Sequence, residues 1–140
     1  MDPHAELFHG LGDPTRLRLL NLLTQAKEIC VCELVDALQI PQYNISRHLH
    51  VLLKTGMVQD YKRGKWVYYS MAKDLKPYQR TLLRVISELR DEREDLHQDE
   101  ARAGRRLKLR SGGFCCVGLT SKIDHRFKDG AQETSALTGR

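Results

Sequence analysis

The chain has 140 residues, of which 41% are hydrophobic and 29% charged, and its formal net charge is +5 at pH 7. This length predicts one domain with a single modest core, and no apolar run approaches the roughly 18 residues of a membrane-spanning helix. The first ten residues lack the apolar core of a signal peptide, so we expect a cytoplasmic protein. Its four cysteines are then expected to be ligands or redox thiols instead of structural disulfides.

The apolar pattern predicts three short helices in the N-terminal part of the chain. The first covers residues 3–11. The second begins at Pro14, with Asp13 as its capping residue, and runs to about Gln25. The third runs from about Val31 to Leu38 and has its apolar residues on one side.

A fourth helix is predicted from Pro41 to about Lys54, and Gly56 ends it as a C-terminal cap. Its apolar residues recur on one helix face: Ile45, Leu49, Leu52 and Leu53. Two amphipathic helices joined by a short link have the form of a helix-turn-helix. This pattern is weak on its own, so the segment that follows is decisive.

That next segment has the pattern of a β-hairpin. Residues 57–60 and 66–70 are its predicted strands, and residues 61–65 form a basic turn that contains Gly64. A helix-turn-helix followed directly by such a hairpin is specific to a winged helix. Between residues 41 and 73 six basic residues stand against one acid, a net charge of +5 that is typical of a surface facing phosphates. On charge alone, a solvated basic face without a partner would be the better interpretation.

One long helix is predicted from Asp74 to about Glu100, because leucines recur at every seventh residue from Leu75 to Leu96. Such a seam packs either on its own domain or against a second subunit, and we favour a homodimer formed through the terminal helices. The predicted fold class is therefore mostly α with a β-hairpin wing, a dimeric winged helix-turn-helix.

Composition divides the chain near residue 104. Residues 1–104 are expected to form the DNA-binding and dimerisation domain. Residues 105–140 are expected to form a flexible C-terminal tail, because five of the ten glycines lie beyond residue 110 among polar residues. The tail carries two adjacent cysteines, Cys115 and Cys116.

Five short stretches between residues 5 and 100 carry a family resemblance. They are Leu11-Gly12-Asp13-Pro14-Thr15-Arg16-Leu17, Cys30-Val31-Cys32-Glu33-Leu34, Ser46-Arg47-His48-Leu49, Gly56-Met57-Val58 and Gly64-Lys65-Trp66-Val67-Tyr68-Tyr69. In this order and spacing they resemble the ArsR/SmtB family of metal- and metalloid-responsive winged-helix repressors, in particular its arsenic-responsive type. The resemblance implies a homodimer that binds double-stranded operator DNA, blocks transcription of a resistance operon and leaves the DNA when an inducer binds.

The helix over residues 41–54 is then the recognition helix, with its N-terminal half in the major groove. Its candidate DNA contacts are Gln42, Tyr43, Asn44, Ser46, Arg47 and His48. Asn and Gln pair well with adenine and Arg with guanine, whereas the serine is expected to reach a phosphate. At the wing, Lys62, Arg63 and Lys65 are expected to contact phosphate or the minor groove. His50 is expected to be an ordinary histidine of the surface or partly buried.

Cys30 and Cys32 are predicted to sense a soft metal or metalloid ion, because thiolates bind such ions and a helix N-terminus lowers the pKa of a cysteine. Residues i and i+2 point to nearly opposite sides of a regular helix. Both sulfurs therefore reach one ion only if Cys30 precedes the helix or the first turn unwinds. Ion binding is then expected to strain the helix that positions residues 41–54, and so to release DNA.

Two thiols rarely suffice for such an ion, so further ligands are expected. The resemblance implies a third cysteine three residues after the second, where this chain has Val35. Cys115 or Cys116 could supply the missing sulfur. Three sulfurs would suit trivalent arsenic or antimony, the favoured inducers, and four would suit cadmium, lead or zinc. Two alternatives remain for Cys115 and Cys116: a separate ion-binding site in the C-terminal tail, or a pair of inert thiols. The family's other site, on the last helix, is not filled, because His97 stands alone among acids.

Three other functions remain as alternatives, and no permanent cofactor is expected. A redox-sensing repressor would form a disulfide in place of binding an ion. A thiol oxidoreductase is disfavoured, and no enzymatic activity is expected, because the chain lacks Cys-x-x-Cys, a phosphate loop, and nucleophile or zinc-protease motifs. A protein-interaction module would require the basic wing and the recognition helix to be coincidental.

Overall fold

Asp2 and Asp13 cap the first two helices of the computed structural model, which describes residues 2–120. Each carboxylate accepts hydrogen bonds from two backbone N–H groups of the first helical turn, and a proline opens each helix. These caps begin α1 (Pro3–Leu11) and α2 (Pro14–Gln25), and both helices are confirmed at their predicted bounds.

The predicted helix-turn-helix is also confirmed, as α3 (Val31–Leu38) and α4 (Gln42–Lys54). Gln39 ends α3 in the left-handed backbone conformation, with φ of 58°, and Pro41 caps the start of α4. Burying a leucine-sized side chain contributes about 1.5–3 kcal/mol, so the apolar faces of α2, α3 and α4 fix how these helices pack. Their fully buried large side chains are Leu19, Leu20, Leu23, Leu34, Leu38, Ile45, Leu49 and Leu52.

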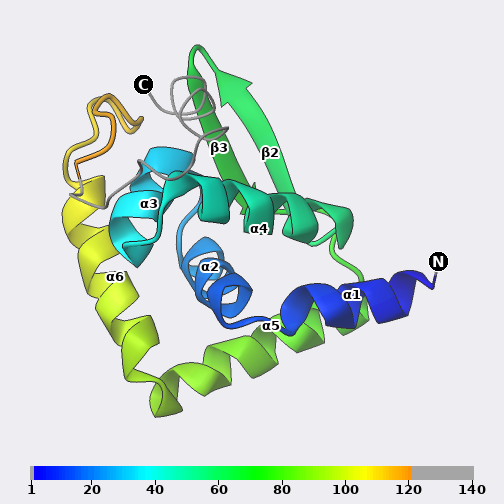
Figure 1. Ribbon diagram of the computed structural model, residues 1–140. Coiled ribbons are helices and arrows are strands. Elements are labelled where there is room, and N and C mark those ends of the chain that lie inside the picture. Colours follow the sequence, from blue (N-terminus) through cyan, green and yellow to red (C-terminus); the bar gives the residue numbers. More distant parts are fainter. Residues whose placement is uncertain (1, 121–140) are drawn as a thin grey trace.

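The wing is an antiparallel hairpin of β2 (Val58–Arg63) and β3 (Trp66–Met71), as predicted, and it projects from the helical layer in Figure 1. Gly64 occupies its turn with a φ of 63°, a conformation that favours glycine. A short strand, β1 (Ile29–Cys30), was not predicted, because two residues are too few to show a strand pattern. It pairs with β3, so that the sheet order is β1-β3-β2 and Cys30 stands opposite Tyr68.

The single long helix predicted from Asp74 to about Glu100 is wrong. Two helices, α5 (Pro77–Leu89) and α6 (Glu94–Leu107), are joined by a 3-10 turn, η1 (Arg90–Glu92), and Figure 1 shows them at a sharp angle. Arg90 holds this corner with two hydrogen bonds to Glu100, of 2.7 and 2.8 Å. Beyond the corner, Leu96 is buried in the chain's own core. The leucine pattern therefore does not continue as one exposed seam, and α6 packs against α3 and α2 instead.

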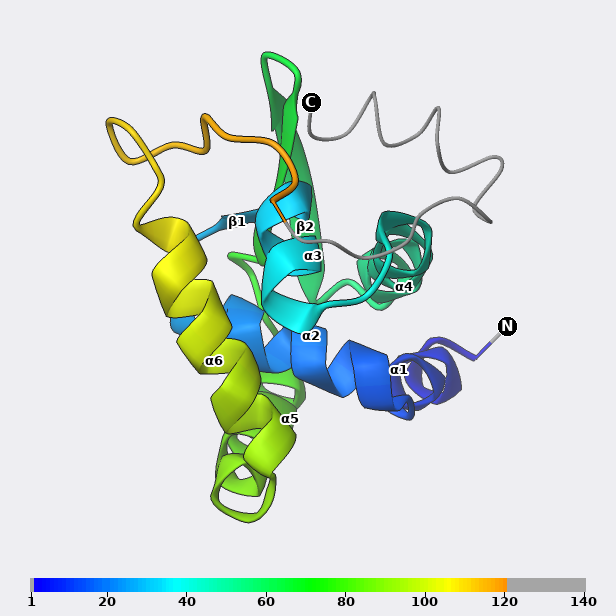
Figure 2. The same cartoon turned by 60° about the vertical axis from the view of Figure 1, so that its left-hand side comes forward.

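The domain boundary expected at residue 104 falls inside α6. Residues 109–120, which we call the strap, continue from α6 and pass over α3 beside the hairpin (orange in Figure 2). Arg106 and Cys115 are both buried, so this part of the expected tail packs against the domain. Residues 121–140 lie outside the described residues. Within residues 2–120, no helix has the length and apolar character that crossing a bilayer requires.

Candidate thiol site and nucleic-acid interface

Cys30 and Cys32 lie on either side of the start of α3. Cys30 ends β1 and caps the helix with an extended backbone (φ −76°, ψ 152°), whereas Cys32 is already helical. Because Cys30 precedes the helix, the two side chains converge and their sulfurs are 3.5 Å apart. This is the first of the two geometries considered from the sequence, and it requires no unwinding of the first turn.

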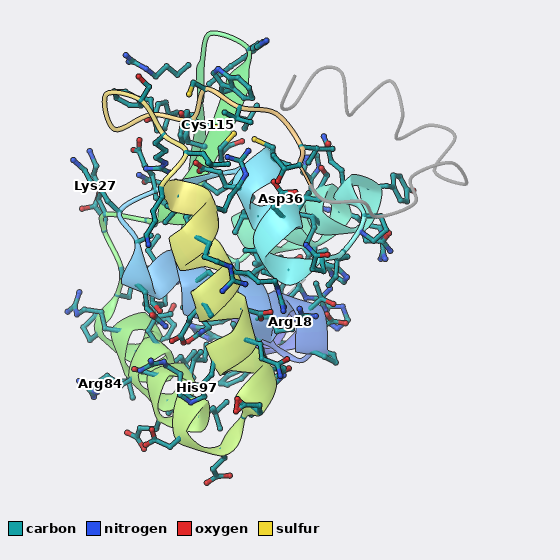
Figure 3. All side chains as sticks on the ribbon, turned by 90° about the vertical axis from the view of Figure 1, so that its left-hand side faces the viewer. Arg18, Lys27, Asp36, Arg84, His97 and Cys115 are labelled. Atoms are coloured by element: carbon teal, nitrogen blue, oxygen red, sulfur yellow. The ribbon has the colours of Figure 1, made fainter. Side chains whose placement is uncertain are left out.

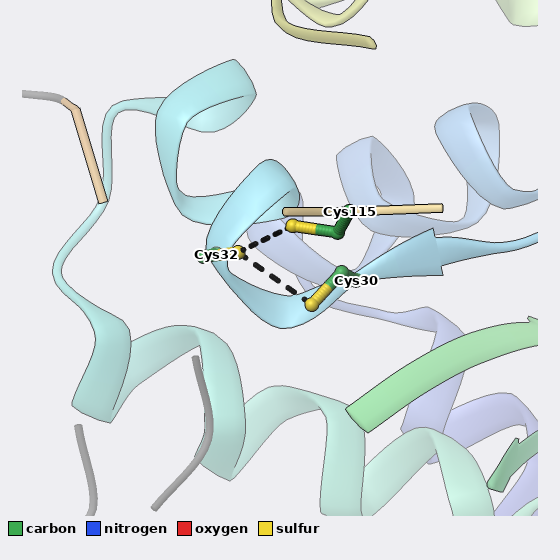
Figure 4. Close-up of side chains that lie close together, drawn as sticks. All are labelled: Cys30, Cys32 and Cys115. Carbon is green, nitrogen blue, oxygen red and sulfur yellow. Dashed lines mark hydrogen bonds between the residues drawn. The ribbon is translucent and has the colours of Figure 1, made fainter. Parts of the chain in front are cut away.

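Cys115 completes a cluster of three sulfurs (Figure 4). Its Sγ lies 3.3 Å from that of Cys32, and the three sulfurs lie within 4.8 Å of one another. Cys30 and Cys32 are fully buried, and Cys115 is 4% exposed. Cys116 is exposed, and its thiol donates to the carbonyl of Leu109 instead. Three of the four candidate cysteines are therefore brought together, and Cys116 is not among them.

The three thiols divide their protons unequally. Hydrogen bonds from the Cys30 and Cys32 thiols lower the pKa of Cys115, and its proximity to Arg106 adds to this effect. The same hydrogen bonds to Cys115, together with burial, raise the pKa values of Cys30 and Cys32. Cys115 is therefore the cysteine of the three that is most readily deprotonated. Three close sulfurs, one of them with a lowered pKa, are a ligand set for a soft ion.

Arg106 of α6 fastens the strap beside this cluster. Its Nη2 donates to the carbonyls of Val117 and Gly118, and lies 3.6 Å from the sulfur of Cys32. Its Nε donates to Asp36 of α3 at 2.6 Å, with both side chains buried. In Figure 3, Asp36 on α3 and Cys115 on the strap are labelled beside the upper part of α6. Arg106 therefore joins α3, α6 and the strap in one network.

Two further contacts hold the strap in place. The backbone N–H of Cys115 donates to the hydroxyl of Tyr68 on β3, at 2.7 Å. Thr120 donates to Asp36 through both its backbone N–H (3.1 Å) and its hydroxyl (2.7 Å). The segment that carries the third sulfur is therefore tied to the wing at one end and to α3 at the other.

The outward face of α4 carries three of the predicted DNA contacts together with His50. A shallow hollow on this face is lined by Tyr43, Ser46, Arg47 and His50. Asn44 is half-buried on the same helix. His50, expected to be an ordinary histidine of the surface or partly buried, is exposed there.

Gln42 and His48, predicted as DNA contacts, are buried instead. Their spacing from Ile45, three residues on either side, places them on the core face of α4, and this pattern was readable from the sequence. The Nη1 of Arg16 lies 3.0 Å from Nδ1 of His48. Because arginine can only donate, Nδ1 accepts and the ring is neutral. The buried side chains of Gln42 and His48 therefore help to position α4 through its core face.

Lys62, Arg63 and Lys65 are exposed on the wing, as a phosphate-contacting role requires. The guanidinium carbon of Arg63 lies 3.7 Å from the centre of the Phe114 ring, so this arginine also contacts the strap. The Lys65 amine lies 5.0 Å from the ring centre of Trp66.

Comparison with known proteins gives one consistent family. The family model for bacterial regulatory proteins of the arsR family matches residues 13–60. The chain is 40% identical over 85 residues to an uncharacterised HTH-type transcriptional regulator of Methanocaldococcus jannaschii, covering 61% of this chain and 92% of that protein. It is 36% identical over 86 residues to the arsenic resistance transcriptional regulator ArsR1 of Pseudomonas putida, covering 61% and 67%. It is 46% identical over 67 residues to the arsenical resistance operon repressor of Escherichia coli, covering 48% and 57%. Further relatives are named as a cadmium resistance regulatory protein and as SmtB repressors.

Proposed function

The chain belongs to the ArsR family of bacterial regulatory proteins, and on that premise we propose that it represses an operon and leaves the operator DNA when trivalent arsenic or antimony binds. Its family and fold make it a DNA-binding transcriptional regulator and not an enzyme. The single observation that carries the proposal is the buried cluster of three sulfurs from Cys30, Cys32 and Cys115.

The geometry of the cluster favours a trivalent ion over a tetrahedral divalent one. Two of its sulfur–sulfur distances are 3.3 and 3.5 Å. A tetrahedral zinc site with Zn–S bonds of about 2.3 Å would hold its sulfurs about 3.8 Å apart. Three thiolates also balance three positive charges, and a pyramidal ion needs no fourth ligand. The names of two relatives refer to arsenic, and the name of another refers to cadmium, which makes divalent cations the competing inducers.

We also propose that the operator-binding form is a homodimer joined through α1 and α5. These helices touch, since the rings of His4 and Tyr78 are 5.4 Å apart. They leave large apolar side chains in solvent, with Phe8 60%, Tyr78 41% and Val85 50% exposed. A second copy of the same surface would cover them, as in an isologous interface. Sedimentation should give a dimer for the wild type and a monomer for Phe8→Glu.

The proposed function is tested by fluorescence anisotropy on a labelled duplex that the reduced protein selects from a random pool. Arsenite and antimonite should release this duplex at lower concentrations than cadmium, lead or zinc. The variants Cys30→Ser, Cys32→Ser and Cys115→Ser should lose the response. Cys116→Ser is the matched control, because its thiol lies next in sequence but outside the cluster, and it should respond as the wild type does.

Three results would overturn the proposal. Failure of every ion to release the duplex would exclude metal sensing, and release by cadmium but not by arsenite would assign a divalent inducer. Release by hydrogen peroxide alone would favour a redox sensor, for which the Cys32 and Cys115 sulfurs at 3.3 Å are already close.

A further inference from the structure

The residue that precedes Cys115 in the strap contacts the wing. Arg63 near the wing tip lies over the ring of Phe114, with 3.7 Å between the guanidinium carbon and the ring centre. This distance is well within the roughly 6 Å of a cation–π contact. The Phe114 ring also packs edge-on against Tyr68, with 6.1 Å between centres and an interplanar angle of 82°. A candidate ligand residue and a candidate DNA contact are therefore separated by one side chain.

The direction of Arg63 follows from the alternation of side chains along β2. Tyr61 and Arg63 share one face of the hairpin, and their cross-strand partners on it are Tyr68 and Trp66. Lys62 points to the other face. Figures 1 and 2 show the strap and α4 on different sides of the hairpin. Arg63 resting on Phe114 is therefore held on the strap side, away from α4.

We propose that Phe114 couples the thiol site to the wing: an ion bound at Cys115 keeps Arg63 on the Phe114 ring and withdraws it from a DNA phosphate. This inference rests on the proposed function, because it requires that the same chain binds DNA and a thiophilic ion. The contact between Phe114 and Arg63 is the path by which ion binding weakens DNA binding.

The convergence of the sulfurs explains why the path runs through the strap. Cys30 and Cys32 already meet without unwinding α3, so an ion that joins them imposes little change on the recognition helix. Cys115 is different, because it lies on the strap, which hydrogen bonds and the packing of Phe114 and Leu119 hold to α3 and β3 without a covalent link. An ion bonded to all three sulfurs adds a strong link at this position and fixes the adjacent Phe114.

Arg63 then has two competing partners, the Phe114 ring and a phosphate. By linkage, an ion that favours the first must lower the affinity for DNA, and DNA must lower the affinity for the ion by the same factor. The stacking contact holds the guanidinium at the strap, and a phosphate contact at the wing requires it to leave the ring. The cost of ion binding to the complex is therefore the loss of one phosphate contact for each wing.

The test measures the salt dependence of DNA affinity with and without arsenite, because this slope counts phosphate contacts. In the wild type, arsenite should reduce the slope of log affinity against log salt concentration by about 0.9 for each wing. In Phe114→Leu, which keeps apolar packing but has no ring, arsenite should leave the slope unchanged. Phe114→Tyr keeps the ring and should behave as the wild type. Arg63→Gln should show the reduced slope already without arsenite.

Arsenite binding is followed separately by the near-ultraviolet absorbance of sulfur–arsenic bonds, and folding by circular dichroism. If wild-type protein binds arsenite and releases DNA with no change in slope, the coupling inference fails while the proposed function stands. Equal changes in Phe114→Leu and the wild type would also overturn the inference. If the wild type neither binds arsenite nor releases DNA, the proposed function itself fails.

Discussion

Helix α4 and the strap carry the candidate contacts to the two ligands of this protein, and they are held in opposite ways. The core face of α4 is fixed by fully buried apolar side chains, Ile45, Leu49 and Leu52. The strap is fixed by hydrogen bonds with polar side chains of the domain, among them Arg106, Asp36, Tyr68 and Glu33, and by the packing of Phe114 and Leu119. The two attachments differ in how many substitutions they tolerate. Apolar burial is spread over many atoms, whereas a polar network depends on single donors and acceptors.

This contrast predicts that ligand sensing and DNA binding can be separated by mutation. Changes to the polar network should weaken the ion response without altering the recognition surface. Changes behind α4 should affect DNA binding and leave the sulfur cluster intact. The variants below test whether ion sensing and DNA binding can be separated in this way.

The largest effect is expected from Arg106→Gln, which removes the buried ion pair between Arg106 and Asp36. Both side chains are almost fully buried, at 3% and 6% exposure. Removing one member of such a pair costs about 3–5 kcal/mol. Urea unfolding should show this loss, and arsenite should no longer release DNA. Arg105→Gln changes the exposed neighbour on α6 and should leave both properties unchanged. An unfolding midpoint of Arg106→Gln equal to that of the wild type would show that the network does not hold the strap.

A smaller and more local effect is expected from Tyr68→Phe. The substitution removes the acceptor of the Cys115 N–H and leaves that donor buried. The cost is about 1–3 kcal/mol, which corresponds to roughly ten- to hundredfold weaker arsenite binding. DNA affinity without arsenite should stay within about twofold, because the Tyr68 hydroxyl faces the strap. Tyr61→Phe is the control, since its hydroxyl bonds Glu28 at the surface. Equal losses in the two variants would contradict a specific role of the Tyr68 hydroxyl.

The same contrast explains which elements could be predicted from the sequence. Helices α2, α3 and α4 and the hairpin were predicted correctly, because each is specified by a local apolar period and by capping or turn residues. The break between α5 and α6 was missed, because the Arg90–Glu100 pair that holds it has no periodic pattern. Packing of the strap was missed for the same reason, since its partners lie far away in sequence.

At the candidate thiol site, the identity of the third ligand could not be predicted from the sequence. The sequence placed Cys30 and Cys32 together and offered either Cys115 or Cys116 as a third ligand. Choosing between adjacent cysteines requires knowing which side of the strap faces α3, and contacts such as that of Tyr68 with the Cys115 backbone decide this. On α4, by contrast, the helical period is sufficient to place Gln42 and His48 on the core face. The prediction that these two residues contact DNA could therefore have been corrected from the sequence.

Proton counting should distinguish the two classes of inducer at the sulfur cluster. Neutral As(OH)₃ releases three waters as it forms three As–S bonds, and it takes up one proton for each thiolate among the three sulfurs. Cadmium bound by the same three sulfurs displaces one proton from each thiol. Cadmium binding should therefore release three protons more than arsenite binding, so that the ratio of cadmium affinity to arsenite affinity rises about a thousandfold per pH unit near neutrality. Calorimetry in buffers of different ionisation enthalpy measures both numbers. Arsenite binding without proton uptake would show that the cluster is fully protonated without an ion.

The smallest effect is expected behind α4, where burial lowers the pKa of His48 despite the opposing charge of Asp13 at 3.8 Å. Arg47 and Arg16 add to the lowering, and the Arg16 donor is satisfied only by the neutral ring. In the unfolded chain a histidine titrates near pH 6.5, so below that pH the unfolded state binds more protons than the folded one. Stability should therefore be unaffected above about pH 6.5 and should decline as the pH falls below it.

Urea unfolding between about pH 5 and 8 should show this decline in the wild type and in His50→Gln, whose histidine is exposed, but not in His48→Gln. The window is distinct from that of Glu100, whose pKa is lowered to about 2 by Arg90, so that its contribution is lost only at more acidic pH. A decline that persists unchanged in His48→Gln would mean that another group titrates, and that the neutral ring does not help to hold α4. Because His48 contacts Asp13 and Arg16 at the start of α2, arsenite affinity in His48→Gln should keep the wild-type pH dependence, which would show that the two attachments respond independently.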